Sequence, residues 1–169
     1  MRASFVLALT AMLAMLLQTT VFPALPWLPD AFAPDLILVL AVYLGLRHRT
    51  ASGALGAFLL GYFLDTFSGT VPGTNACALT VVFTMTYLLA RNLWVEGGVT
   101  VVVVVLLAGC VREGVLLLTE VLSRALTSGH PAWHHVLLAG LPQTLAAALA
   151  APAIFALVRW QRRQLGLVA

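Results

Sequence analysis

The chain has 169 residues, of which 62% are hydrophobic and only 9% are charged. A soluble domain needs more charge than this to cover its surface, so the composition excludes a soluble globular protein and predicts an integral membrane protein. The formal net charge of +3 arises mostly from arginines that lie between apolar runs. These arginines point to membrane topology and anionic lipid headgroups and give no reason to expect nucleic acid as a partner.

Six apolar runs predict six transmembrane helices in a single membrane domain over residues 1–169. No connecting segment exceeds about thirteen residues, which leaves no room for a soluble catalytic domain. The expected fold class is therefore an all-α integral membrane protein whose second helix is short. The expected helices cover residues 4–22, 35–46, 51–67, 74–90, 99–122 and 136–158.

The arginines are sorted relative to these runs. If the amino terminus lies in the cytoplasm, Arg124 falls outside and every other arginine at a helix end falls inside. This asymmetry is what the positive-inside rule expects, and it predicts a multi-pass protein with both termini in the cytoplasm. The arginines on the inside are Arg2, Arg47, Arg49, Arg91, Arg159, Arg162 and Arg163.

The first two helices have unusual flanks. Residues 4–22 lack a clean signal cleavage site, so a retained signal anchor is expected, and polar residues such as Gln18 can bond a neighbouring helix. Residues 23–34 are rich in proline and are expected on the outer face. The second helix then has only twelve residues and reaches about 18 Å, short of a hydrocarbon core of roughly 30 Å. Either the proline segment dips into the protein or the bilayer thins.

The third helix carries a groove of small residues. Gly53, Ala57 and Gly61 recur every four residues, and Gly56 lies beside them. In lipid, where apolar burial drives helix association only weakly, such a groove allows another backbone to approach closely. Two interpretations remain open at this point: packing against another helix of the same chain, or binding of a partner's transmembrane helix.

Three polar side chains converge on the outer side by topology alone. Asp35 begins the second helix, Asp65 lies near the end of the third, and Asn75 lies near the start of the fourth. Asp35 is well placed to cap the second helix and to complement its dipole, and Asn75 is placed to cap the fourth. The intervening turn, which contains Gly73, is rich in residues that tolerate unusual backbone angles.

The fifth helix holds Arg112 and Glu113 close to the middle of the bilayer. A central arginine costs at least about 2.5 to 3.5 kcal/mol when it faces lipid, so neither residue should do so. Adjacent residues point about 100° apart, and we expect these two not to satisfy each other fully. Arg112 then needs an acid from another helix, either Asp65 or Asp35. A structural ion pair that fixes helix packing and a functional role both remain open.

Motifs for catalysis and metal binding are absent from the sequence. It lacks the usual hydrolase, metalloprotease and nucleotide-binding patterns, and the histidine pair His134 and His135 has no cysteine or carboxylate nearby. Cys77 and Cys110 fall within apolar runs and are expected to be buried or lipid-facing thiols. We therefore expect no enzymatic activity, metal or cofactor. An intramembrane enzyme that uses Asp65 or Glu113 is a third alternative, for which no substrate suggests itself.

The segment from residue 33 to residue 76 resembles the rod shape-determining protein family MreD. The similarity rests on a Pro-Asp pair before a short helix, a glycine-spaced helix that ends in Asp, and a Gly-x-Asn-Ala turn. Beyond this segment, residues 77–169 match the family only in hydropathy. The residues carried over are Pro34, Asp35, Gly53, Gly56, Gly61, Asp65, Gly73 and Asn75.

The resemblance implies a non-enzymatic component of the bacterial cell-elongation machinery in the inner membrane. It implies a fold like that of the substrate-capture components of energy-coupling vitamin transporters. It also implies binding to the single-spanning periplasmic protein MreC, and through it an indirect connection between MreB filaments and the peptidoglycan synthases. No role for Arg112 or Glu113 follows from the resemblance.

The alternative is a small-molecule binding subunit of an energy-coupling transporter, which the polar residues of the outer half would suit. Such subunits usually carry an Ala-x-x-x-Ala motif on the first helix. Here Ala8, Ala11 and Ala14 are spaced by three, which counts against the alternative.

Overall fold

The computed structural model describes residues 10–21, 33–47, 50–68, 71–92, 97–127 and 133–164, and these residues form helices without any strand. The first helix is α-helical from Thr10 and ends in a π-helical turn, η1 (Leu17–Val21). The remaining helices are α2 (Leu36–Arg47), α3 (Ala51–Ser68), α4 (Thr74–Asn92), α5 (Gly98–Thr127) and α6 (Trp133–Gln164). The all-helical fold class is therefore confirmed for this part of the chain.

The bounds of α2, α3 and α4 agree closely with those expected from hydropathy, whereas α5 and α6 are longer. α5 continues to Thr127, and an ion pair between Glu120 and Arg124, one turn apart, lies on the surface of this extension. α6 begins at Trp133, continues to Gln164 and contains Pro142 and Pro152 without ending at either. Hydropathy locates only the apolar middle of a helix, so polar terminal turns were missed. Residues 4–9, 22–32 and 128–132 lie outside the described residues.

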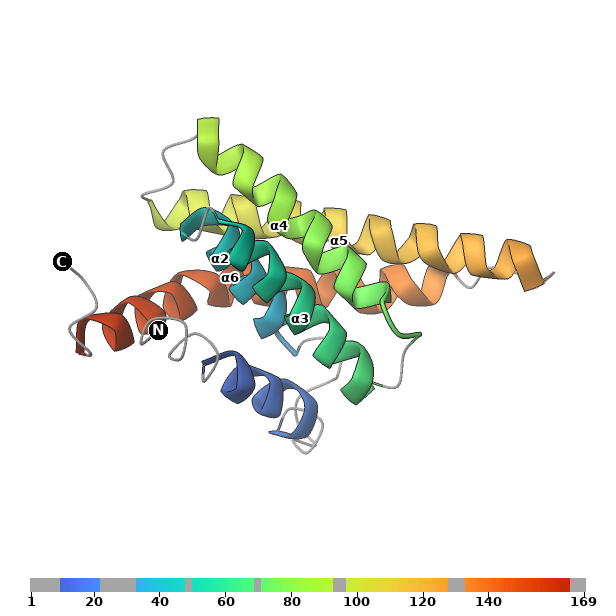
Figure 1. Cartoon of the computed structure of the whole chain (residues 1–169), viewed down its shortest axis with the longest axis horizontal. Helices are drawn as coiled ribbons and strands as arrows, with labels where there is room; N and C mark the ends of the chain where they lie inside the picture. Colours follow the sequence, from blue (N-terminus) through green and yellow to red (C-terminus); the bar gives the residue numbers. More distant parts are fainter. Residues whose placement is uncertain are drawn as a thin grey trace.

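α2 is the core of the bundle. Its residues from Ile37 to Leu46 are all buried, none more than 9% exposed, and α2 packs against α3, α4, α5 and α6 (Figure 1). A helix that is apolar on every face belongs inside other protein elements. Tyr43 packs edge-on against Phe155 of α6, with ring centroids 5.1 Å apart. Because α2 is enclosed by protein, its short length does not have to match a bilayer.

The small-residue groove of α3 is filled by α4. Gly53, Ala57 and Gly61 are buried, and a Cβ atom at Gly61 would collide with the backbone of Asn75 and Ala76. Gly56 instead faces α2, where an added Cβ would lie 3.5 Å from Leu44. Packing within the chain is therefore the interpretation that the structure supports. The alternative, an open groove for a partner's helix, was wrong.

α5 and α6 form a second close pair through two glycines that face each other's helix. A Cβ atom at Gly109 of α5 would collide with Thr144 of α6, and a Cβ atom at Gly140 of α6 would collide with the carboxyl group of Glu113 of α5. The two contacts are four residues apart on each helix, as an antiparallel pair requires. Each helix thus places a side chain into a gap left by a glycine on the other.

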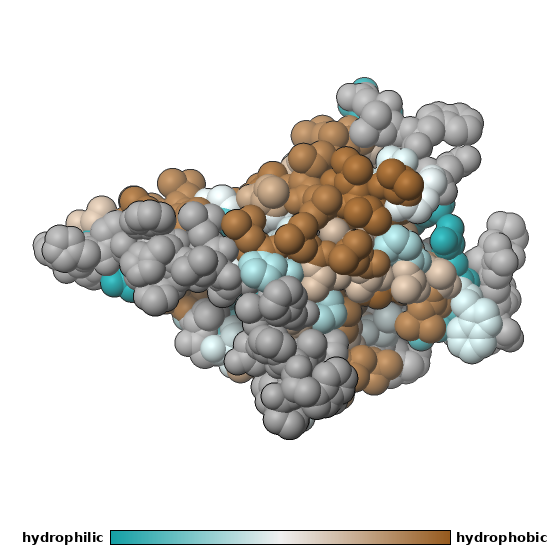
Figure 2. All heavy atoms as spheres, turned by 180° about the vertical axis from the view of Figure 1, so that it is seen from behind, coloured by the Kyte–Doolittle hydropathy of each residue, from teal (hydrophilic) through white to brown (hydrophobic). Residues whose placement is uncertain are grey.

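The outer surface is strongly apolar. Figure 2 shows hydrophobic side chains over a broad area of the face opposite to that of Figure 1. Two helices in the described part of the chain are long and apolar enough to cross a membrane, Gly98–Ala125 and Gly140–Gln161. Exposed large hydrophobic side chains also cover α3 and α5, including Leu55, Phe58, Tyr62, Phe63, Phe67, Val99, Val103, Leu107, Leu118 and Leu122.

Candidate functional site

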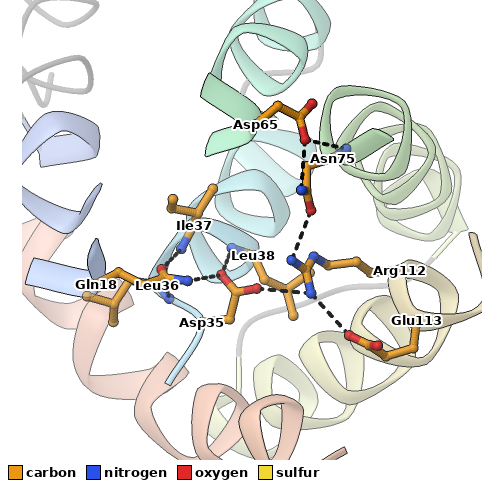
Figure 3. A network of polar contacts seen from close by, with 9 residues as sticks. All are labelled: Gln18, Asp35, Leu36, Ile37, Leu38, Asp65, Asn75, Arg112 and Glu113. Atoms are coloured by element: carbon orange, nitrogen blue, oxygen red, sulfur yellow. Dashed lines mark hydrogen bonds and ion pairs between the residues drawn. The ribbon is translucent and has the colours of Figure 1, made fainter. Parts of the chain in front are cut away.

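A network of polar side chains connects the first helix, α2, α3, α4 and α5 (Figure 3). It extends from the end of the bundle where α2 and α4 begin toward the middle of α5. Asp35, Asp65, Asn75 and Glu113 are each at most 5% exposed, and the side chain of Arg112 is 12% exposed. Together with Gln18, these residues are called the polar network below. Buried polar groups require hydrogen-bond partners, and the residues of the network supply most of these to one another.

Asp35 and Gln18 together cap α2. Asp35 Oδ1 accepts a hydrogen bond from the backbone N–H of Leu38 at 3.0 Å and another from Gln18 Nε2 at 3.3 Å. Gln18 Oε1 accepts from the N–H groups of Leu36 and Ile37 at 3.1 and 3.3 Å. The first amide groups of a helix have no partner within it, so this arrangement satisfies three of them. The predicted capping role of Asp35 is confirmed, and Gln18 bonds a neighbouring helix as expected.

Asp65, at the end of α3, caps α4. Its Oδ2 accepts hydrogen bonds from the N–H groups of Gly73 at 2.9 Å and Ala76 at 3.3 Å. Its Oδ1 accepts from the backbone N–H of Asn75 at 3.1 Å and from Asn75 Nδ2 at 2.8 Å. Gly73 has a φ of +96°, a conformation that favours glycine. The prediction that Asn75 caps α4 was wrong, because α4 begins at Thr74 and the acceptor comes from another helix.

Arg112 lies at the centre of the network. Its Nη1 is 3.4 Å from Asp35 Oδ2 and 3.0 Å from Glu113 Oε1, and its Nη2 donates to Asn75 Oδ1 at 3.1 Å. Among the described residues, its buried Nε has no hydrogen-bond partner. The expectation of an acid from another helix is confirmed for Asp35, whereas Asp65 is reached only through Asn75. Glu113 does pair with Arg112, because both side chains are long enough to bridge the angle between adjacent positions.

The network contains three carboxylates and one guanidinium group. Asp35 and Asp65 receive backbone N–H donors at the amino-terminal ends of α2 and α4, which stabilise negative charge. Glu113 instead lies against the Cα atom of Gly140 and has Arg112 as its ion-pair partner. Asp35 and Glu113 thus share Arg112, whereas Asp65 is held by the amino-terminal end of α4, so the carboxylates of the network fasten helices together.

Two cavities over the described residues lie apart from the polar network. One is an open groove along α4 between Thr80 and Leu89, and the other lies at the opposite end of the bundle beside Arg47 and Arg159. Within the same part of the chain, no three His, Cys, Asp or Glu side chains are grouped so as to hold a metal ion.

Most of the residues predicted as site candidates come together here. Asp35, Gly61, Asp65, Gly73, Asn75, Arg112 and Glu113 lie in or against the network, with Pro34 directly before Asp35. Gly53, Gly56 and Ala57 lie at least one turn before Gly61 in α3, where they pack that helix against its neighbours. Cys77 and Cys110 are exposed on the protein surface. The side chains of His134 and His135 lie outside the described residues.

Sequence reasoning missed Gly109 and Gly140, the two glycines that hold α5 and α6 together. Each is a glycine within an apolar helix, a position where glycine costs helical stability and so signals a close approach. That signal was available in the sequence, but it does not say which side chain fills the gap.

No protein-family model, curated protein or solved structure matches this chain.

Proposed function

We propose that this chain is a non-enzymatic, six-span component of the bacterial cell-elongation machinery with a role like that of MreD. In this proposal it lies in the inner membrane with both termini in the cytoplasm and binds a single-spanning periplasmic protein of the MreC type. Through that partner it helps to connect an MreB-like filament with the synthases of lateral peptidoglycan.

One observation carries the proposal. Several of the positions that carry the resemblance to MreD are far apart in the sequence, yet they meet at one junction. Asp35 caps α2, and Asp65 caps α4. Gly61 lies against the backbone of Asn75. Residues that hold one junction together are the kind that a shared fold would preserve as a motif. The carboxylates at this junction cap helices, which agrees with a non-enzymatic role.

Two features support membrane insertion, and a third supports the placement of both termini on one side. Two helices are apolar and long enough to cross a bilayer, and large apolar side chains are exposed on the outer helices. The hydroxyl of Thr10 donates to Gln161 Oε1 at 3.0 Å, so the first helix starts beside the end of α6. An even number of spans brings the two ends of a chain to the same side of a membrane in this way.

The face of α3 that points away from α4 is the surface we propose for the partner's helix. It carries Phe58, Tyr62, Phe63 and Phe67, all exposed. Large aromatic side chains offer many dispersion contacts to a helix packed against them, and van der Waals packing is a main source of helix association in lipid. This face belongs to the same helix as Asp65. The opposite groove of Gly53, Ala57 and Gly61 is already filled by α4 and cannot take a partner's helix.

Co-purification tests the proposal. The tagged full chain is expressed with a single-spanning coiled-coil protein of the MreC type encoded in the same genome, and the two are expected to co-purify in mild detergent. Phe63→Ala combined with Phe67→Ala should reduce the captured partner at least fivefold. Leu118→Ala combined with Leu122→Ala on α5 is the matched control, because these side chains are also exposed and apolar.

Depletion of the chain in its host should also convert rods into rounded cells. Retention of rod shape after depletion would overturn the proposal. So would a small molecule that stays bound to the purified chain in native mass spectrometry, since this would favour a vitamin-capture subunit.

A further inference from the structure

A basic cleft lies at the end of the bundle opposite the polar network's helix caps. It forms where α2 ends, α5 begins and α6 passes, and its lining includes Arg47, Arg159, Gly97, Gly98 and Phe155. The cavity has a volume of about 40 Å³. A cavity needs roughly 10 to 15 Å³ to hold one water molecule, so the cleft has room for about three water-sized groups. That is enough space for the two non-bridging oxygens of a phosphodiester.

Both arginines have donors to spare. Arg159 Nε donates to the carbonyl of Phe155 at 3.3 Å, which uses one of the five N–H groups of its guanidinium. Among the described residues, no carboxylate lies within ion-pair distance of Arg47 or Arg159. Both side chains are exposed to the surroundings of the protein. Two arginines from different helices that share one small cavity produce a positive potential that neither would produce alone.

A simpler account treats Arg47 only as a favourable charge at the carboxyl-terminal end of α2. That account explains one arginine, but it does not explain why a second, from α6, lines the same cavity. Glycines at positions 97 and 98 also keep the rim of the cleft free of side chains, and an added Cβ at Gly98 would meet nothing within 4 Å. An exposed apolar stripe of Val99, Val103 and Leu107 starts one residue beyond Gly98.

We propose that this cleft binds the phosphate of an anionic phospholipid from the inner leaflet, with Arg47 and Arg159 as the phosphate ligands. Arginine matches phosphate oxygens with its planar fork of donors, and basic pockets between transmembrane helices on the cytoplasmic side suit anionic headgroups. The inference rests on the proposed membrane topology, which places this end of the bundle in the cytoplasm. It does not depend on the identity of the protein partner.

The test uses the full chain purified in detergent without any partner and titrated with phosphatidylglycerol or phosphatidylcholine. Native mass spectrometry should show the anionic lipid bound in preference to the zwitterionic one. Arg47→Gln combined with Arg159→Gln should weaken binding of phosphatidylglycerol roughly ten- to thirtyfold. Arg91→Gln is the matched control, because Arg91 lies in the last turn of α4 at the same end, is exposed and does not line the cleft.

One further variant sharpens the result. Arg47→Lys with Arg159→Lys keeps the charge and should retain more binding than the glutamine pair, which excludes a simple loss of folding.

Several outcomes would overturn the proposal: equal affinity for both lipids, an equal loss for Arg91→Gln, or no loss for the glutamine pair. Inorganic phosphate that binds at micromolar concentration in the absence of lipid, with the same dependence on the two arginines, would reassign the cleft to a free anion. Failure of the partner to co-purify would leave these lipid measurements unchanged. Recovery of the chain in the soluble fraction would overturn the proposed topology and this inference together.

Discussion

Arg112 Nη1 lies 3.4 Å from Asp35 Oδ2, an ion pair that joins the middle of α5 to the first residue before α2. The same carboxylate accepts the N–H of Leu38, so one side chain both caps α2 and holds α5 against it. Breaking a buried ion pair by removing one partner is costly, because the other charge remains buried without compensation. The stability of the bundle should therefore depend strongly on this contact.

Arg112→Leu should destabilise the chain by about 3 to 5 kcal/mol, since Asp35 and Glu113 would both lose their cationic partner. Thermal unfolding of the detergent-purified protein measures this as a large fall in melting temperature. Arg124→Leu is the control, because Arg124 pairs with Glu120 at a more exposed position on the same helix and should cost less than about 1 kcal/mol. Equal effects of the two variants would contradict a central role for Arg112.

Asp65→Ala should loosen the first turn of α4, because the backbone N–H groups of Gly73, Asn75 and Ala76 would lose their acceptor. The loss of a helix cap costs roughly 1 to 2 kcal/mol, and the cost should exceed this range where buried donors are left unsatisfied. Hydrogen exchange at residues 73–76 should accelerate. Asp65→Asn keeps one acceptor oxygen, so its exchange rates should lie between those of the wild type and of Asp65→Ala. Thr66→Ala, on the exposed face of α3, should change these rates little.

Gly61 and Gly56 should respond oppositely to substitution by alanine. A Cβ atom at Gly61 meets backbone atoms of α4, which cannot move aside without separating α3 from α4, so Gly61→Ala should cost about 1 to 3 kcal/mol. At Gly56 the nearest atom is 3.5 Å away on a flexible leucine, and alanine favours the helix by up to about 1 kcal/mol. Unfolding midpoints should therefore fall for Gly61→Ala and stay level or rise for Gly56→Ala. A fall of equal size at both positions would contradict this account.

The convergence of Asp35, Asp65 and Asn75 could be predicted because alternating helix direction alone places their helix ends on one side. Capping by Asp35 could also be predicted, since the acceptor and the amides it serves are adjacent in the sequence. The cap of α4 could not be predicted, because the residue that accepts the hydrogen bonds belongs to α3 and reaches α4 only through helix packing. For the same reason, the sequence does not reveal that Gly140 faces Glu113, a contact set by the register of two long helices.

The contact between Gly109 and Thr144 predicts a specific interaction between two substitutions. Gly109→Ala should destabilise the α5–α6 pair, because the new methyl group would collide with the side chain of Thr144. Thr144→Ala removes the atoms that lie nearest and leaves only the Cβ atom, at 3.0 Å, so the double variant should recover much of the loss. A double-mutant cycle on unfolding free energies should give a coupling of about 1 kcal/mol or more. Additive effects would show that the helices pack in another register.

The native cysteines can distinguish a membrane protein from a soluble helical bundle. Cys77 and Cys110 are both exposed on the protein surface, so in a soluble protein both thiols should react readily with a water-soluble maleimide. In the proposed topology Cys110 lies twelve residues into α5, or about 18 Å deep, near the middle of the bilayer. Lipid would then shield it, because a water-soluble maleimide does not enter the hydrocarbon core of the bilayer. We expect Cys110 to stay unlabelled in intact membranes and to react after denaturation in detergent, as measured by peptide mass spectrometry on a Cys77→Ser background. Rapid labelling of Cys110 in native membranes would exclude α5 as a lipid-facing span.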